Sequence, residues 1–367
     1  MTSPVERARE FKREVRPQLL RWFDRSKRDL PWRRSREPYG VWVSEVMLQQ
    51  TQVERVVRYW TKFVARFPNV ASLAEAELKD VLGLWTGLGY YSRARNLHLA
   101  SKELMLRFGG ELPDSVESLL TLPGFGRYTA GAVASIAFEL EAPLVDGNVA
   151  RVLSRLLELD GVPGEKTREA ALWGAAEVLV EGARPGDWNQ ALMELGATVC
   201  VPQNPLCLVC PVRASCQALR AGRVDELPRP KKPAKRKRLE LVVAVARRGH
   251  EVLLARREER GLFGGLWELP GVELAPGANG DAALQKCLGK KASIGPELTV
   301  LERTLTHRDL VLRLHAVSIP RRLARPPPGY LEWRWVPDSE ISALGMSSAM
   351  QAALAASLPS PAPARSG

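Results

Sequence analysis

The chain has 367 residues, of which 53 are basic and 41 acidic, giving a formal net charge of +12. This length suffices for two domains that each bury a core, and a hydrophobic content of 45% with 26% charged residues excludes a disordered chain. No apolar run approaches the roughly 20 residues of a membrane-spanning helix, so we expect no membrane association. The basic excess favours a polyanionic partner such as DNA or RNA, without identifying it.

The amino-terminal stretch, MTSPVERAREFKREVRPQLL, is charged throughout and contains no apolar leader. We therefore expect a cytoplasmic, nucleoid-associated protein whose thiols are reduced. Nothing in the sequence calls for more than a monomer, and no protein partner is indicated.

The composition changes along the chain and predicts four parts. Up to about residue 222, Leu, Ala, Glu and Arg recur at helical spacing between prolines, which predicts successive helices joined by short turns. Residues 223–238 end in PRPKKPAKRKR and predict a basic linker. Alternating apolar segments over residues 239–356 predict an α+β domain, with helices near 282–288 and 347–356. The Pro-, Ala- and Ser-rich residues 357–367 predict a disordered tail.

Two acidic residues stand out by their surroundings. Glu45, in VWVSEVMLQQ, is enclosed by apolar residues on a predicted helix, where an ionised carboxylate would be costly. Its pKa should therefore be raised, which makes it a candidate proton donor near neutral pH; a solvated helix edge is the alternative. Asp146, in LVDGNVAR, precedes an apolar helix and has the position of a helix cap, a role that is compatible with a catalytic one.

Between two apolar helical patterns lies the sequence LPGFGRY, residues 122–128. Gly124 and Gly126 permit a tight turn at positive φ and leave amide N–H groups uncovered at the start of the next helix. Such a helix start is an anion site. Residues 113–138 thus predict a helix–hairpin–helix that holds a nucleic-acid backbone without reading bases; an ordinary turn between helices is the alternative.

Four cysteines, Cys200, Cys207, Cys210 and Cys216, fall within seventeen residues. Reduced thiols this close, in a loop with three prolines, can reach one metal centre. Only Cys207 and Cys210 form a CxxC pair, so an iron–sulfur cluster fits better than zinc. Zinc and a disulfide remain alternatives. The fifth cysteine, Cys287, has no partner nearby in sequence.

Several long motifs carry a family resemblance: LPWR at 30–33, VWVSEVMLQQTQV at 41–53, LWTGLGYYSRARNL at 84–97, LPGFGRYTAG at 122–131, DGNVARVL at 146–153, and the cysteine loop at 200–216. From about residue 16 to 354 the chain resembles the helix–hairpin–helix DNA glycosylases of the endonuclease III superfamily, and among them the MutY type, the adenine DNA glycosylases. The resemblance implies a multidomain protein with an all-α helix–hairpin–helix core, one [4Fe-4S] cluster and a Nudix-like α+β domain.

The resemblance also implies the reaction. The substrate would be double-stranded DNA in which adenine is mispaired with 8-oxoguanine or guanine, with the adenine flipped out of the duplex. Glu45 would protonate the adenine, Asp146 would stabilise the sugar cation, and Tyr128 would orient the two carboxyl groups. Bifunctional relatives have a lysine where this chain has Tyr128, so the resemblance implies a monofunctional enzyme that does not cut the strand efficiently.

Further roles come from the same resemblance. The residues matching the family's adenine pocket are Arg28, Trp32, Leu48 and Val53. Those matching DNA-contacting positions are Gln50 and Tyr90, together with Leu122, Gly124, Gly126 and Arg127 of the hairpin. For Trp32 and Tyr90, ordinary core packing is the alternative.

The Nudix-like domain lacks the Glu-rich REXXEE helix with which a working Nudix hydrolase binds Mg²⁺, so we expect no pyrophosphohydrolase activity. One loop departs from the pattern of the glycosylase family. The family's Phe-Ser-His lesion-reading loop is replaced by Leu305-Thr306-His307. We expect Thr306 and His307 to contact 8-oxoguanine, without the packing contribution of the family's aromatic ring.

Overall fold

The computed structural model describes residues 3–230, 236–259, 261–320 and 325–357. Residues 231–235 of the expected linker and 358–367 of the expected tail lie outside the described residues. The chain divides into two compact units, one of Met1–Glu75 with Asn96–Lys232 and one of Ala76–Arg95 with Pro233–Gly367. In the part of the chain that the structure describes, no helix is both long and apolar enough to cross a membrane.

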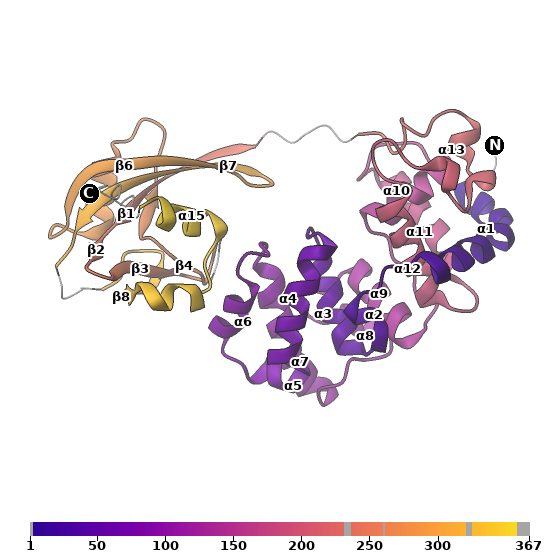
Figure 1. The fold of residues 1–367 in the computed structure, drawn as a ribbon, viewed down its shortest axis with the longest axis horizontal. Helices are drawn as coiled ribbons and strands as arrows, with labels where there is room; N and C mark the ends of the chain where they lie inside the picture. Colours follow the sequence, from indigo (N-terminus) through magenta and orange to yellow (C-terminus); the bar gives the residue numbers. More distant parts are fainter. Residues whose placement is uncertain (1–2, 231–235, 260, 321–324, 358–367) are drawn as a thin grey trace, which may run out of the picture. The chain divides into compact units, whose positions relative to one another are not determined.

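The first unit is helical, as the sequence predicted (Figure 1). Its α-helices are α1 (Pro4–Ser26), α2 (Pro31–Ser35), α3 (Pro38–Leu48), α4 (Val53–Arg66), α5 (Val70–Glu75), most of α7 (Ser92–Phe108), α8 (Val116–Leu120), α9 (Arg127–Phe138), α10 (Gly147–Leu156), α11 (Lys166–Val180), α12 (Pro185–Thr198) and α13 (Gln217–Arg220). Two 3₁₀ turns, η1 (Cys207–Val209) and η2 (Arg213–Ser215), lie in the cysteine loop.

The core of this unit explains the apolar character of its central helices. Residues from α1, α9, α10, α11 and α12 form one buried cluster around Trp188 and Leu153. Helix α3 packs against α9, and residues 39–47 of α3 are buried on every side. A helix that is apolar all round belongs in the interior of a protein, so the position of Glu45 on α3 is itself an interior position.

The second unit consists of α6 (Leu78–Trp85), the turn after it, the start of α7 and an α+β domain. The first of its two sheets has the order β5-β1-β7-β6, in which β1 and β7 are parallel and the other pairs antiparallel. In the second sheet, β3 pairs with β2, β4 and β8. The elements are β1 (Lys237–Val245), β2 (Arg247–Arg248), β3 (Glu251–Arg257), β4 (Trp267–Glu268), β5 (Gly271–Glu273), α14 (Gly280–Leu288), β6 (Ser293–Thr304), β7 (Arg308–Ser318), β8 (Tyr330–Pro337), η3 (Asp338–Ala343) and α15 (Ser348–Ala356).

The strand β1 is buried on both faces of its sheet. Leu241 and Val243 belong to one core cluster, which includes α15, whereas Val242 and Ala244 belong to another, which includes Leu284 of α14. Because successive side chains of a strand point to opposite faces, helices on both faces require the continuous apolar run LVVAV. The predicted α+β class and both predicted helices are confirmed, whereas β8 was not predicted.

Candidate active site

A cavity of about 420 Å³ opens in the first unit, among α2, α3, α9, α10 and α12. It brings together residues that are far apart in sequence, including both acidic candidates and Tyr128. The predicted residues that line it are Arg28, Trp32, Glu45, Leu48, Gln50, Val53, Tyr128 and Asp146. Its remaining lining residues are Leu30, Arg33, Gln49, Thr51, Val145, Gly147, Asn148, Gln190, Met193, Glu194 and Ala197.

Glu45 lies at the wall of this cavity and is only 3% exposed. Burial raises its pKa from the ordinary 4.5 to about 7, and the charge of Asp146 acts in the same direction. The Tyr128 hydroxyl and the charge of Arg33 partly oppose this shift. Glu45 is therefore partly protonated near neutral pH, which is the condition for a general acid that must later act as a base.

Tyr128 stands in the first turn of α9, from which its hydroxyl donates a hydrogen bond to Oε2 of Glu45. The same hydroxyl lies 3.6 Å from the sulfur of Met193. Burial and the two nearby carboxyl groups raise the pKa of Tyr128 well above its ordinary value. The phenol consequently keeps its proton. It acts as the hydrogen-bond donor that holds Oε2 of Glu45 in place.

Asp146 is the N-cap of α10, so the interpretation as a helix cap is confirmed. Its Oδ1 accepts from the Val149 amide at 2.7 Å, and its Oδ2 accepts from Nδ2 of Asn148 at 3.2 Å. Burial raises the pKa of Asp146, whereas these donors lower it. The same carboxylate lines the cavity, so the cap fixes the position of a carboxyl group in its wall.

Glu194 of α12 also lines the cavity and was missed from the sequence. It is 1% exposed and accepts from Arg28 Nε at 2.7 Å, Arg28 Nη2 at 3.0 Å and Arg33 Nη2 at 2.9 Å. Burial alone would raise its pKa, but the two arginines hold that pKa below the ordinary value. The signal was present, because Glu194 is the lone acid of the apolar segment ALMELG, as Glu45 is of its own helix.

The predicted hairpin joins α8 to α9. Gly124 has φ +79°, and a Cβ there would stand 2.7 Å from Cβ of Asn96, so glycine is required. Gly126 has φ −98° and begins α9 without a side-chain cap, so the expectation of positive φ holds for only one of the two glycines. The first turn of α9 therefore carries amides that no capping side chain covers, as an anion site needs.

The two other hairpin residues differ in exposure. Leu122 is 3% exposed and anchors the turn in the core, so its side chain is not accessible to a ligand. Arg127 is exposed; its guanidinium lies 3.9 Å from the ring centre of Trp173 and 3.6 Å from the carboxylate of Glu177. The backbone amides and the exposed Arg127, rather than the Leu122 side chain, are thus the parts of the hairpin that are open to a phosphate.

All five cysteines are free thiols, which removes the disulfide alternative. The buried Arg155 donates to Sγ of Cys200 at 3.4 Å and to the carbonyl oxygens of Val201 and Pro202. Burial raises the pKa of Cys210 to about 12, and the charges of the other three thiols add to this. The thiols thus influence one another, although in the described residues no group of three or more His, Cys, Asp or Glu is arranged to hold a metal ion.

The donor set nevertheless suits an iron–sulfur cluster. Four cysteines on one loop provide the ligands that such a cluster takes, and an arginine aimed at sulfur suits a thiolate, because a neutral thiol is a weak acceptor.

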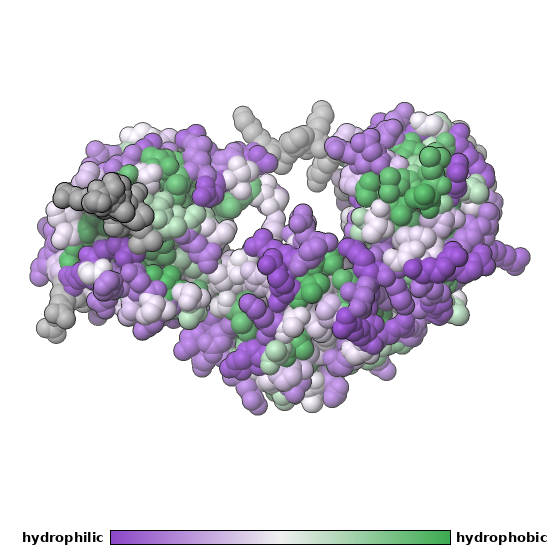
Figure 2. Space-filling model, viewed as in Figure 1, coloured by the Kyte–Doolittle hydropathy of each residue, from purple (hydrophilic) through white to green (hydrophobic). Residues whose placement is uncertain are grey.

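Figure 2 shows hydrophobic surface on the first unit in the area of α10 and α13, and the adjoining loop exposes Leu206, Leu208 and Val209. Cys287 lies in the second unit, with its Sγ 3.8 Å from the carbonyl oxygen of Gly271.

The remaining predicted residues lie in loops or turns. Gln50 follows α3 at φ +60° and is exposed at the cavity. Tyr90 belongs to the second unit, has φ +48° and is 41% exposed, so it is not a core residue. Its hydroxyl is hydrogen-bonded to Oγ1 of Thr306, while His307 lies in the turn between β6 and β7.

Comparison with known proteins gives two family matches. Residues 43–177 match the model of the HhH-GPD superfamily of base excision DNA repair proteins, and this range contains Glu45, Tyr128 and Asp146. Residues 242–356 match the model of the NUDIX domain, which covers most of the α+β domain.

Whole-chain relatives extend this similarity. An adenine DNA glycosylase of Mus musculus is 38% identical over 92% of this chain and 76% of its own length. That of Homo sapiens is 37% identical over 92% of this chain and 72% of its own length. Among solved structures, a thermostable thymine-DNA glycosylase matches 58% of this chain and 98% of its own, with a TM-score of 0.53 and 28% identity.

Proposed function

The chain belongs to the adenine DNA glycosylase family, and from this membership we propose that it hydrolyses the glycosidic bond of adenine mispaired with 8-oxoguanine or guanine. We propose further that it does so without cutting the strand. The observation that carries the proposal is the meeting of Glu45, Tyr128 and Asp146 in one cavity.

The first step is departure of the base. The adenine must leave the duplex stack, because its glycosidic bond is inaccessible inside the helix. In the cavity, Glu45 donates its proton to N7 of adenine, so that the base leaves as a neutral molecule when the C1′–N9 bond breaks. A pKa of about 7 suits this transfer, which contributes about 10²–10⁴ in rate in comparable enzymes.

The second step is addition of water. Loss of the base leaves a cationic, oxocarbenium-like sugar, and the carboxylate of Asp146 stabilises it, as the second carboxylate does in glycosidases. Glu45, now ionised, accepts a proton from water while the water oxygen bonds to C1′. The protonation state of Glu45 is thereby restored, and Tyr128 holds it in place throughout.

The absence of strand cleavage follows from the chemistry of position 128. Strand cleavage through a Schiff base needs an amine nucleophile. Tyr128 supplies a phenol that is bound to Glu45, and none of the described residues lining the cavity is a lysine. Hydrolysis by water is the reaction that these groups support.

We propose that Arg28, Trp32, Leu48 and Val53 form the base pocket, and that the hairpin amides and Gln50 contact the DNA. Thr306 and His307 would read 8-oxoguanine. One [4Fe-4S] cluster would be held by Cys200, Cys207, Cys210 and Cys216, where it would cross-link the loop and supply no catalytic group. Net charge supports a monomeric enzyme that works at the nucleoid.

The test uses duplexes that carry a single A:8-oxoguanine, A:G or thymine glycol site, incubated with and without alkali. We expect strand breaks at adenine only after alkali. Breaks at thymine glycol without alkali would indicate a bifunctional lyase, and the absence of any product with all three duplexes would refute the enzyme assignment.

A further inference from the structure

Helix α6 and the turn after it pack onto the α+β domain. Leu82 of α6 is 2% exposed, and a Cβ on Gly345 would stand 3.0 Å from Cβ of Leu82. A Cβ on Gly83 would stand 3.1 Å from the carbonyl oxygen of Ala343. Two glycines, one on each side, thus let the two backbones approach closely. Sequence periodicity had assigned this segment to the helical domain, within residues 1–222.

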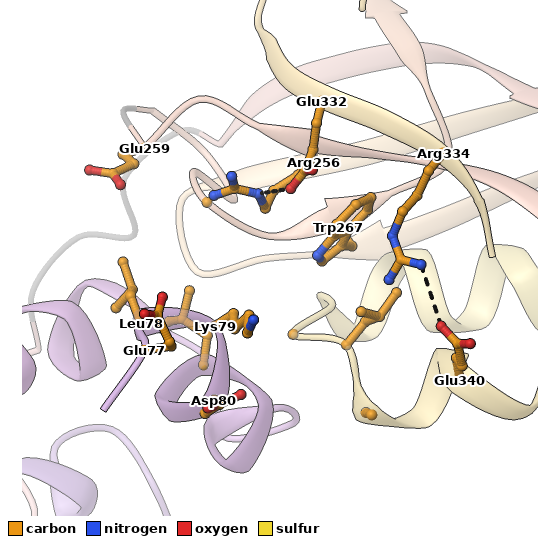
Figure 3. A pocket seen from close by; sticks show the side chains of 15 residues that line it. Glu77, Leu78, Lys79, Asp80, Arg256, Glu259, Trp267, Glu332, Arg334 and Glu340 are labelled. Atoms are coloured by element: carbon orange, nitrogen blue, oxygen red, sulfur yellow. Dashed lines mark hydrogen bonds and ion pairs between the residues drawn. The ribbon is translucent and has the colours of Figure 1, made fainter. Parts of the chain in front are cut away.

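A pocket of about 650 Å³ borders this contact. Figure 3 shows Leu78 and Lys79 of α6 on one side and Trp267 and Arg334 on the other. Arg334 lies 5.2 Å from the ring centre of Trp267 and pairs with Glu340 at 3.4 Å. The docked part of α6 is therefore its apolar face around Leu82, while its first turn faces a charged opening.

Two side chains fasten the end of the segment to the same domain. Tyr91 is 7% exposed, and its hydroxyl donates to the carbonyl oxygen of Met346 at 2.7 Å. Arg95 donates from Nη1 to the carbonyl oxygen of Gly264 at 2.6 Å. Both acceptors are backbone carbonyl oxygens. The two hydrogen bonds therefore hold segment 77–95 against the backbone of the α+β domain and do not depend on the rotamer of another side chain.

Tyr90 directly precedes the anchor residue Tyr91. Its φ of +48° is unusual for a residue with a side chain, and the residue is 41% exposed. Its hydroxyl is hydrogen-bonded to Oγ1 of Thr306, at the tip between β6 and β7. Tyr90 and Thr306 are thus already paired within one unit, 216 residues apart in sequence.

We propose that Tyr91 and Arg95 are positioning residues that dock the segment 77–95 onto the α+β domain, so that Tyr90 meets the DNA as part of the lesion-reading domain, paired with Thr306. The role in reading 8-oxoguanine rests on the proposed function. The docking of segment 77–95 is independent of the proposed function. It predicts that this segment, in addition to the covalent linker, binds the α+β domain.

The docking is tested first without DNA. A site for a specific protease is inserted between residues 232 and 233, and the purified full chain is cut. We expect the two fragments to co-elute in size-exclusion chromatography. Tyr91→Phe should weaken their association about three- to tenfold, and Gly83→Val, which presses on Ala343, should weaken it more. The matched control is Tyr39→Phe, which removes an equally buried hydroxyl bonded to the carbonyl oxygen of Phe67 at 2.8 Å in the first unit and should leave the association unchanged.

The second test measures the ratio of single-turnover rates on A:8-oxoguanine and A:G duplexes with the uncut chain. Tyr91→Phe and Arg95→Met should lower this ratio about three- to tenfold, with the A:G rate within twofold of wild type, whereas Tyr39→Phe should leave the ratio unchanged.

The two tests separate the two claims. Wild-type fragments that separate on cutting would overturn the docking, whatever the activity. A wild-type chain without adenine excision would overturn the proposed function, and only the fragment test would then apply. Variants that weaken fragment association but keep the wild-type rate ratio would overturn the positioning role.

Discussion

Replacing Glu45 by glutamine should abolish excision and at the same time stabilise the protein at alkaline pH. Folding raises the pKa of this carboxyl from 4.5 to about 7, so the folded state binds its proton more tightly than the unfolded chain does. The stability that this proton binding contributes is fully present below about pH 4.5 and is lost as the pH rises through about 7. At pH 8 the ionised Glu45 therefore lowers the free energy of unfolding by about 3 kcal/mol, and a neutral amide at this position would not.

The assay is a pair of chemical denaturation series on the wild type and on Glu45→Gln, at pH 5 and at pH 8. The variant should be more stable by about 3 kcal/mol at pH 8, and the gain should shrink to about 1 kcal/mol at pH 5. Tyr128 can still donate to the amide oxygen, so the hydrogen bond at this site is retained. An equal effect at both values of pH, or destabilisation at pH 8, would show that burial does not control this carboxyl.

Three further predictions concern Tyr128, Asp146 and the cysteine loop. Tyr128→Phe removes a donor that lowers the pKa of Glu45, so the alkaline limb of the single-turnover rate profile should move up by about one pH unit, the equivalent of a hydrogen bond of about 1.5 kcal/mol; an unmoved limb would contradict this. Asp146→Asn keeps a good N-cap but loses the charge, so we expect an excision rate lower by about 10²–10³ with a melting temperature close to wild type; a large loss of stability would point to a purely structural role. Cys210→Ser should lower the bound iron, the visible absorption and the DNA affinity measured by fluorescence anisotropy, and unchanged iron content would exclude this residue as a ligand.

Glu45 and Asp146 could be proposed as site residues because the signals that mark them are local in sequence. Glu45 is recognisable as the single acid of an apolar helix, and Asp146 as a cap before GNV, without knowledge of their contacts. Glu194 shows the limit of this reasoning. It has the same surroundings in sequence as Glu45, but its state depends on Arg28 and Arg33, which are more than 160 residues away and reach it only in the folded chain.

Two other features were not predicted from the sequence, for different reasons. The strand β8, YLEWRWVP, alternates aromatic and charged residues, and its tryptophans should have marked it as a strand. The segment 77–95 was predicted as part of the helical domain and consists of α6, a turn and the start of α7. Helical periodicity shows which face of a helix is buried, but not which other element covers that face. The partner of this segment, the backbone around Gly345 and Met346, is more than 250 residues later, and only the fold brings the two together.

The cavity shows how one residue type takes two charge states. Glu45 and Glu194 are both almost fully buried in its wall, and burial pushes the pKa of each upward. Glu194 meets two guanidinium groups, which outweigh burial and keep it ionised. Glu45 meets a neutral phenol and a second carboxyl group, so burial prevails and the proton stays available near pH 7. The ionised carboxylate of Glu194 and the exchangeable proton of Glu45 therefore follow from the different partners of the two glutamates.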